Sequence, residues 1–219
     1  MPRARFVKKE NAIWISHLDT MRLFQRAFKR SGLLLKHTQG FNPRPSVSIA
    51  MPLSVGVESE CELLDFELDG QSVPCEEIMN RLNTTLVPGV AVTDVYDNGI
   101  KLKDLKYLKC SVSLEYDNGI PEGALQEIRN LFSRSELFME KKGKNGLVQH
   151  DIIPMIKSLE VDALDDYILQ LKALICCQEP SLNPSQLINA VNVYLPQYQP
   201  NHSKCRRLEL HDGQENIFR

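Results

Sequence analysis

Hydrophobic and polar positions along the first half of the chain follow two periods, one typical of strands and one typical of helices. Strands are predicted from two-residue alternation or β-type composition at 3–9 (RARFVKK), 12–16 (AIWIS), 46–53, 62–68 and 90–96. Helices are predicted over 16–32 and over 74–86, the second beginning near Pro74. With the two short runs at 3–9 and 12–16 taken together as the first β region, the predicted order of elements is β-α-β-β-α-β.

The helix predicted over 16–32 has marked ends and two different faces. Ser16 is a favourable N-cap, Asp19 completes a variant of the capping box, and Gly32 ends the helix. One side carries an apolar stripe for the core, made of Leu18, Met21, Phe24, Ala27 and Phe28. The other side carries a cluster of cations: Arg22, Arg26, Lys29 and Arg30. Such a cluster is either a solvated face or a surface for an anion, and we favour the backbone of a nucleic acid.

The second half repeats this order in outline. Strands are predicted at 109–116, at 137–150 as a hairpin turning at Gly143–Gly146, at 166–175 and at 206–211. Helices are predicted over 121–132 and 183–195. Residues 150–165 fit neither repeat and are interpreted as an insertion or connection. The predicted fold class is therefore α+β, with tandem ferredoxin-like (β-α-β-β-α-β) units and antiparallel sheets. The predicted domains are 1–98, which is basic, and 103–219, which is acidic.

Charge is unevenly distributed along the chain, although the formal net charge is only −2. Residues 1–50 hold ten Lys or Arg and only Glu10 and Asp19 as acids, a formal charge of +8. The remaining residues carry 16 basic and 26 acidic side chains, a formal charge of −10. This asymmetry indicates an anionic partner or, alternatively, two ends that neutralise one another.

Composition excludes several classes of protein. The apolar runs are too short to span a bilayer and the first residues lack the apolar middle of a signal peptide, so we expect a cytoplasmic protein without membrane contact. The six cysteines have no zinc or iron–sulfur spacing, and no glycine-rich nucleotide motif is present. We therefore expect reduced core thiols, no metal and no cofactor.

The segment GFNPRPS at 40–46 is predicted to be a stiff, exposed loop that presents an arginine. Pro43 and Pro45 steer Asn42 and Arg44 out of the α region, and Gly40 permits a bend. Lys36 and Arg44 extend the basic surface, and Phe41 is the better candidate for stacking on a base. Trp14, by contrast, is expected in the core.

His17 and Asp19 invite a catalytic interpretation, but two residues apart on a helix they do not face each other. No motif places a nucleophile beside them. A packed histidine is the favoured interpretation of His17, and an acid–base role in RNA cleavage is the alternative. Glu58 and Glu60 are interpreted as charges of a turn and a strand edge, with contact to a metal or a basic partner as the alternative.

Residues 3–68 resemble a known bacterial family through the SHLD helix start, the RAF-x-R sequence, the GFNPRP loop and the segment PLSVGVESE. These motifs are similar to those of the radical-SAM-linked proteins, which are encoded beside, or fused to, a radical SAM protein with a cobalamin-binding-type domain. The resemblance implies a stand-alone accessory domain and a radical SAM partner encoded nearby. The element order also resembles CRISPR-associated repeat-RNA-binding proteins, an analogy of fold alone.

Together these features predict a non-catalytic RNA-binding or adaptor protein that acts with a separate radical SAM enzyme on an RNA or ribosomal target. The predicted nucleic-acid-binding residues are Arg22, Arg26, Lys29, Arg30, Lys36, Phe41 and Arg44. A metal-independent RNA endonuclease that uses His17 is one alternative. A protein–protein scaffold that binds no nucleic acid is the other.

Overall fold

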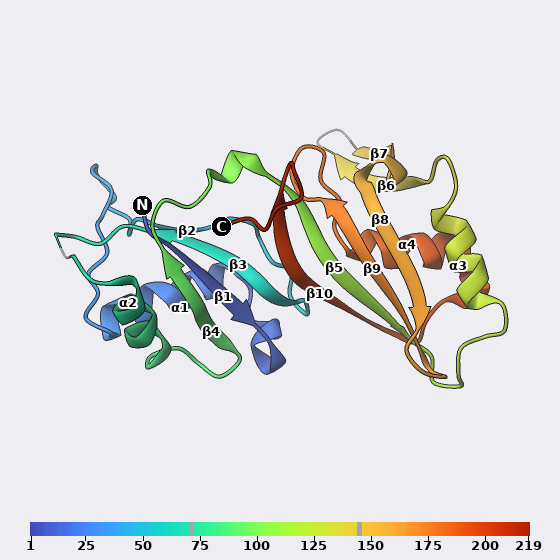
Figure 1. Cartoon of the computed structure of the whole chain (residues 1–219), viewed down its shortest axis with the longest axis horizontal. Helices are drawn as coiled ribbons and strands as arrows, with labels where there is room; N and C mark the ends of the chain where they lie inside the picture. The colour runs from blue at the N-terminus through green and yellow to red at the C-terminus, as the bar shows by residue number, and fades with distance from the viewer. Residues whose placement is uncertain (71, 144–145) are drawn as a thin grey trace. The chain divides into compact units, whose positions relative to one another are not determined.

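The computed structural model describes residues 1–70, 72–143 and 146–219, which form two compact units. Unit 1 comprises Met1–Leu102 together with Arg219, and unit 2 comprises Lys103–Phe218. Each unit is a mixed α/β structure with a mostly antiparallel sheet and few helices (Figure 1). The short helix η2 (Leu102–Asp104) lies where one unit ends and the next begins in the chain.

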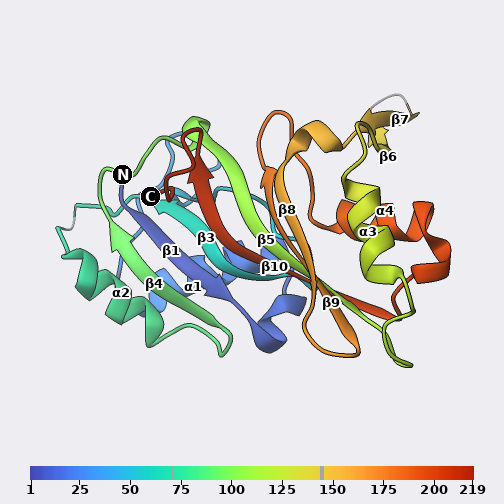
Figure 2. The same cartoon turned by 45° about the vertical axis from the view of Figure 1, so that its right-hand side comes forward.

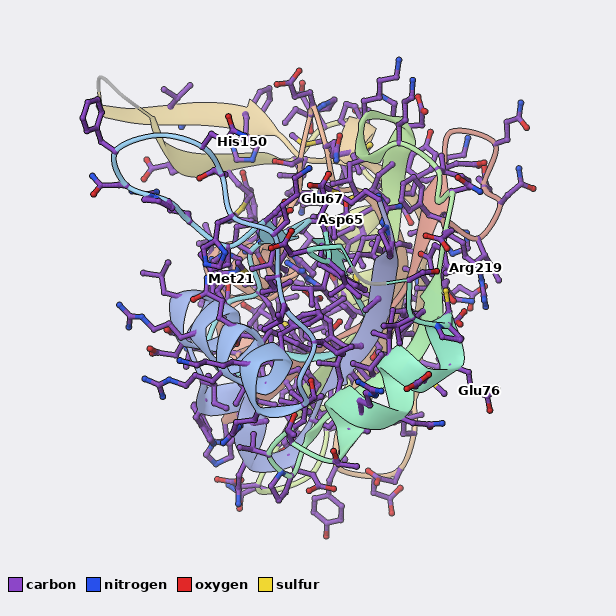
Figure 3. All side chains as sticks on the ribbon, turned by 90° about the vertical axis from the view of Figure 1, so that its left-hand side faces the viewer. Met21, Asp65, Glu67, Glu76, His150 and Arg219 are labelled. Carbon is purple, nitrogen blue, oxygen red and sulfur yellow. The ribbon has the colours of Figure 1, made fainter. Side chains whose placement is uncertain are left out.

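In unit 1, the central strand of the sheet is β1, which pairs antiparallel with β3 on one side and β4 on the other. The short strand β2 also pairs antiparallel with β3. The helices α1 and α2 lie on the same face of this sheet (Figure 3). The bounds of these elements are β1 Arg3–Lys8, η1 Glu10–Trp14, α1 His17–Arg30, β2 Val47–Ile49, β3 Glu58–Phe66, α2 Cys75–Asn83 and β4 Val90–Tyr96.

The core of unit 1 forms between α1 and the sheet. The Phe6 and Phe24 rings meet edge to face with centroids 4.7 Å apart, and those of Phe28 and Phe66 are 4.9 Å apart. The predicted apolar stripe of α1 is wrong at its first position, because Leu18 is 66% exposed. Thr20 is buried in the first turn instead, and its hydroxyl donates to the Ser16 carbonyl 2.9 Å away, which satisfies its polar atom.

The run AIWIS does not form a strand, and that prediction is wrong. Residues Glu10–Trp14 form the 3₁₀ helix η1, in which Ala12 is the buried residue. The backbone turns at Glu10, which has a φ of 50°. The Lys8 ammonium is buried and donates to the carbonyl oxygens of Ile13, at 3.2 Å, and Ile15, at 2.5 Å. A charged donor at these carbonyls stabilises the turn in place of a strand ladder.

In unit 2, the sheet has the strand order β10-β5-β9-β8, and all three pairings are antiparallel. Strands β6 and β7 form a separate two-stranded sheet. The helices α3 and α4 lie beside one another and cover one face of the larger sheet (Figure 2). The bounds are β5 Leu105–Glu115, α3 Ala124–Phe132, β6 Phe138–Gly143, β7 Gly146–Asp151, η3 Ile153–Met155, β8 Ile156–Ala163, β9 Ile168–Cys176, α4 Ser185–Tyr194, η4 Pro196–Tyr198 and β10 His202–Asp212.

Residues 150–165 are not merely an insertion or connection, because they supply β8, the edge strand of the larger sheet. The hairpin β6–β7 stands apart from that sheet instead. The pairing of β8 with β9 shifts at Lys157, so one extra residue interrupts the two-residue alternation. Ile156, Leu159 and Val161 therefore show no regular period in the sequence. Residues 144 and 145, within the predicted turn of the hairpin, lie outside the described residues.

The six cysteines are free, and three of them are buried. Cys110 lies on β5 between the buried residues Leu108 and Val112, as the alternation predicts. Burial raises the pKa of the Cys110 thiol to about 12 and that of Cys205 to about 11. Both thiols therefore stay protonated at neutral pH and behave as small core residues.

Candidate nucleic-acid interface

The start of α1 is held by a capping interaction on its exposed side. The backbone N–H of Asp19 donates to Ser16 Oγ at 3.2 Å, and the Ser16 hydroxyl donates to Asp19 Oδ2 at 2.7 Å. Arg22 Nη1 lies 2.9 Å from Asp19 Oδ1. The hydrogen bond from Ser16, followed by that from Arg22, lowers the pKa of Asp19 below its usual value. Part of the predicted cationic face is thus used to stabilise the helix start.

Two of the four cations of α1 have partners within unit 1, and the other two are exposed. Arg22 is paired with Asp19, and Arg30 Nη2 donates to the Thr85 carbonyl at 2.7 Å. Arg26 and Lys29 are exposed, and within the described part of the chain neither takes part in an ion pair or a side-chain hydrogen bond. Figure 3 shows nitrogen-tipped side chains projecting outward from α1. Arg26 and Lys29 are therefore the two helix cations that are available to an external anion.

The chain after α1 folds back along β3 and fixes the base of the GFNPRPS loop. Backbone hydrogen bonds join Lys36 N to Glu67 O (2.9 Å) and Ser46 N to Lys36 O (2.7 Å). Thr38 is bonded twice to Arg44, through Thr38 N to Arg44 O at 2.8 Å and Arg44 N to Thr38 Oγ1 at 3.0 Å. Gly40 has a φ of 136°, a conformation that favours glycine at the bend. The loop is thus held at its base by main-chain contacts.

The loop presents Phe41 and Arg44 to solvent. Phe41 is fully exposed, and Arg44 is exposed with no ion pair among the described residues. Lys36 differs from the expectation of an unbalanced cation, because its Nζ lies 3.1 Å from Glu67 Oε2. Glu67 lies just beyond the end of β3 (Figure 3). Arg44 is consequently the free cation of the loop, whereas Lys36 is partly neutralised.

A groove of about 420 Å³ lies between α1 and the segment that follows it. Its lining from α1 includes Arg26, Phe28 and Lys29, and its lining from the following segment includes Leu34, His37 and Pro45. The groove therefore brings two of the predicted binding residues, Arg26 and Lys29, next to the base of the GFNPRPS loop. Leu34 and His37 were not predicted as members of the site. The signal for Leu34 was its place in the apolar run Leu33–Leu35, in which it is the only exposed residue.

Unit 1 as a whole is not basic, in contrast to the charge predicted for residues 1–98. Residues 1–102 contain 12 Lys or Arg and 12 Asp or Glu side chains. Acids from β3 and β4 pair with cations elsewhere in the unit: Asp65 with Arg3 at 2.6 Å, Glu60 with Lys9 at 3.3 Å and Asp94 with Arg219 at 3.0 Å. The positive charge is therefore local to the side of α1 and the loop, where Asp19 and Glu67 offset only part of it.

His17 lies half-buried at the first position of α1, beside a small cavity. Lys8, Glu62 and Thr20 line this cavity with it, and the volume is only about 10 Å³. Glu62 is buried and accepts a hydrogen bond from Ser59 Oγ at 2.7 Å. The cavity has room for about one water molecule. Sequence reasoning missed Lys8 and Glu62, although the alternation of Ala4, Phe6 and Lys8 on β1 places that lysine on the core face.

Trp14 is not part of the core, and that expectation is wrong. Its side chain is 67% exposed and lies 3.5 Å from the position that a Cβ at Gly56 would take. Gly56 has a φ of 82°, and its N–H donates to the Ile13 carbonyl at 2.9 Å. Trp14 therefore covers a turn of the backbone at the surface.

Among residues 1–70, 72–143 and 146–219, no group of three or more His, Cys, Asp or Glu side chains is arranged to hold a metal ion. No helix within the same residues has the length and apolar character needed to cross a membrane.

Comparison with known proteins gives a family match and a likeness of fold. A family described as an uncharacterized protein conserved in bacteria (DUF2344) matches residues 2–184. No curated protein matches the chain. A chain in the crystal structure of a Cbf5-Nop10-Gar1 complex is similar with a TM-score of 0.51 and 10% identity, over 95% of this chain and 48% of that chain.

A crystal structure of an unknown protein from Galdieria sulphuraria also matches, with a TM-score of 0.27 and 8% identity, over 94% of this chain and 96% of that chain. The second likeness is too low to support an argument. The first supports a mixed α and β fold, and the chain spans about half the length of that protein.

Proposed function

The chain belongs to DUF2344, a family of proteins conserved in bacteria, and we propose that it is a non-catalytic RNA-binding or adaptor protein. The observation that carries the proposal is a set of exposed cations at one side of unit 1 that form no ion pair or side-chain hydrogen bond with the described residues: Arg26, Lys29 and Arg44. Exposed cations that are not held in a close ion pair are free to contact the phosphates of a nucleic-acid backbone.

The fully exposed Phe41 supports RNA in particular. An aromatic ring in solvent gains little from packing, but it can stack on an unpaired base. Phe41 lies three residues from Arg44 in a loop that is held at its base by hydrogen bonds to Lys36 and Thr38. The Phe41 ring can stack on a base of single-stranded RNA, and Arg44 on the same loop can contact its phosphate backbone.

The proposed fold of each unit is ferredoxin-like. In unit 1 the element order is β-α-β-β-α-β, and the strands pair in the order β4-β1-β3, with β2 on β3. In unit 2 the same order follows once the hairpin β6–β7 is set aside, with β10-β5-β9-β8 as the sheet. These pairings support a duplicated unit, an arrangement that suits an RNA-binding surface on one copy and a protein-binding surface on the other.

A radical SAM enzyme is the proposed protein partner. This part of the proposal depends on the resemblance of residues 3–68 to the radical-SAM-linked proteins. Its test is co-expression of the chain with the radical SAM protein encoded nearby, followed by size-exclusion chromatography. Co-elution would support the adaptor role, and separate elution at micromolar concentration would contradict it.

The nuclease alternative has less support in the surroundings of His17. The cavity beside it is about 10 Å³, which leaves no room for a phosphodiester. The scaffold alternative predicts that the protein has no affinity for nucleic acid.

Direct binding of a structured RNA with single-stranded loops separates these functions. We expect the substitution of Arg26, Lys29 and Arg44 by Gln to weaken RNA binding by about tenfold or more. A matched variant with Gln at the exposed residues Lys101, Lys103 and Lys106 should bind as the wild type does. Equal affinity of the two variants would contradict the proposal, and cleavage of the bound RNA would favour the nuclease.

A further inference from the structure

The groove beside α1 combines an apolar floor with a polar rim. Phe28 and Leu33 are completely buried beneath it, and Leu34 is 55% exposed within it. Its volume of about 420 Å³ lies within the range of small-molecule sites, roughly 300–1,000 Å³. An apolar surface of this size, open to solvent, fits a flat apolar body better than a phosphate alone.

The rim carries positive charge and both kinds of hydrogen-bonding group. Arg26 and Lys29 line the groove, and no acidic side chain is among its lining residues. Gln25 and His37 also line it, and within the described residues their side chains make no hydrogen bond. An amide both donates and accepts, as does a neutral imidazole. The occupant should therefore be anionic beside the helix and should carry donors and acceptors on its edge.

We propose that this groove receives one unpaired nucleobase of the RNA, with the adjacent phosphates at Arg26 and Lys29. The inference rests on the proposed RNA-binding function and names the part of the RNA that unit 1 recognises. An unpaired base supplies an apolar face for Leu34 and an edge with donors and acceptors for Gln25 and His37. A base within a duplex is stacked and paired on its edge, so it cannot enter.

The groove is ordered before binding. Leu33 N donates to the Phe28 carbonyl at 3.0 Å, and Asp69 N donates to the Leu34 carbonyl at 2.8 Å. The first of these bonds attaches the floor to α1. The second, together with the bond from Lys36 N to Glu67 O, attaches it to the chain just after β3. A preformed site loses little conformational entropy on binding, which favours recognition of a single nucleotide.

The test uses the complete chain and two RNA probes of about twelve nucleotides. One probe is single-stranded oligouridine, and the other has the same backbone with all bases removed, so the two carry equal charge. Leu34→Lys is the diagnostic variant, because it fills the groove with a polar chain while adding a positive charge. Val148→Lys, at an exposed apolar position of β7, is the matched control.

We expect the wild type and Val148→Lys to bind oligouridine at least about tenfold more tightly than the abasic strand. In a Phe41→Ala background, which removes the other proposed base-stacking side chain, Leu34→Lys should lose that preference and bind both probes alike, although its charge is higher. If the preference for oligouridine is the same in Phe41→Ala with and without Leu34→Lys, the groove assignment is overturned and RNA binding is left intact. Equal affinity of the wild type for the two probes would also overturn the groove assignment, because only phosphates would then be recognised.

The outcome that would reject the RNA-binding function itself is distinct, since neither probe would bind to the wild type. Binding of a fluorescent acidic peptide tests whether the groove receives a protein ligand instead. If Leu34→Lys abolished binding of that peptide and left the oligouridine preference unchanged, the groove would be a peptide site and the inference would be wrong.

Discussion

The two units each have a groove beside their first helix, but the grooves differ in charge. In unit 1 the groove lies between α1 and the segment before β2, and its charged lining residues are cations, Arg26 and Lys29. In unit 2 a groove of about 530 Å³ lies between α3 and β8, and it includes Glu160 and Asp162 beside Arg129 and Lys157. Grooves at comparable places in the chain thus have different electrostatic surroundings.

The cations of the second groove are engaged by unit 2 itself. Arg129 donates to the Val161 carbonyl through Nε at 2.9 Å and Nη2 at 2.6 Å, and Nη2 lies 3.0 Å from Asp162 Oδ1. Lys157 Nζ is 3.5 Å from Glu215 Oε1. Arg129 therefore stabilises the edge strand β8. Arg26 and Lys29 make no hydrogen bond or close ion pair with the described residues, and Arg26 acts on Asp19 only at longer range. The partners of a cation, rather than its presence in a groove, therefore decide whether it can bind an external anion.

Charge reversal in the first groove should have the largest effect. Replacing Arg26 and Lys29 by Glu removes two phosphate contacts and adds two repulsive charges, so we expect RNA affinity to fall by about 100-fold. Fluorescence anisotropy with a structured RNA measures this loss. The same reversal at Lys103 and Lys106, exposed in unit 2, is the control, and an equal loss there would show that only net charge matters.

Removal of the loop side chains should have the next largest effect. Phe41→Ala should weaken single-stranded RNA binding by about 1–3 kcal/mol, because a stacked base loses its platform. Arg44→Ala should also weaken RNA binding by about 1–3 kcal/mol, and it should reduce the difference in affinity between RNA sequences. Tyr167→Ala removes an exposed aromatic ring of unit 2 and serves as the control. If Phe41→Ala and Tyr167→Ala bind RNA equally well, the stacking role is wrong.

Arg129→Met should affect the stability of unit 2 rather than RNA binding. The variant leaves the Val161 carbonyl without its guanidinium donors, and we expect unfolding to become easier by about 1–3 kcal/mol. Urea denaturation measures the change, and anisotropy should show unaltered RNA affinity. A stable variant that has lost RNA affinity would contradict the contrast between the grooves.

The smallest effect is expected at the cap of α1. Ser16→Ala should reduce the free energy of unfolding by about 1 kcal/mol, because Asp19 N loses its acceptor. The folded-state pKa of Asp19 is lowered, so its stabilising contribution is present above the ordinary value of 3.8 and is lost as the pH falls below it. The variant should therefore lose less stability than the wild type on acidification through that range. An identical acid response would contradict this role of Ser16.

Much of the fold could be predicted from local patterns. Alternation identified β3, β4, β5 and β9, and Ser16 with its capping partner identified the start of α1. The patterns failed where tertiary contacts override local preference. The buried Lys8 ammonium holds the turn of η1 in place of a strand, and the shift at Lys157 conceals the alternation of β8.

The candidate site was predicted as a set of cations, and the structure divides that set. The one-dimensional sequence could not show that Arg22, Arg30 and Lys36 have partners in Asp19, the Thr85 carbonyl and Glu67. Two of these partners lie 31 and 55 residues away along the chain. Arg26, Lys29 and Arg44 are the members without such partners, and their binding to RNA stays a prediction.

The salt dependence of RNA binding reports how many cations of unit 1 contact phosphates. Affinity for a single-stranded RNA is measured across a salt series for the wild type, for Arg26→Gln with Lys29→Gln, and for Arg22→Gln with Arg30→Gln. We predict that the slope of log affinity against log salt falls by about 1.4 in the first double variant, from about 0.7 for each lost phosphate contact. The second double variant should change the slope much less, because its cations are already engaged within unit 1. Equal slopes for the wild type and the Arg26–Lys29 variant, with both proteins folded, would contradict the account.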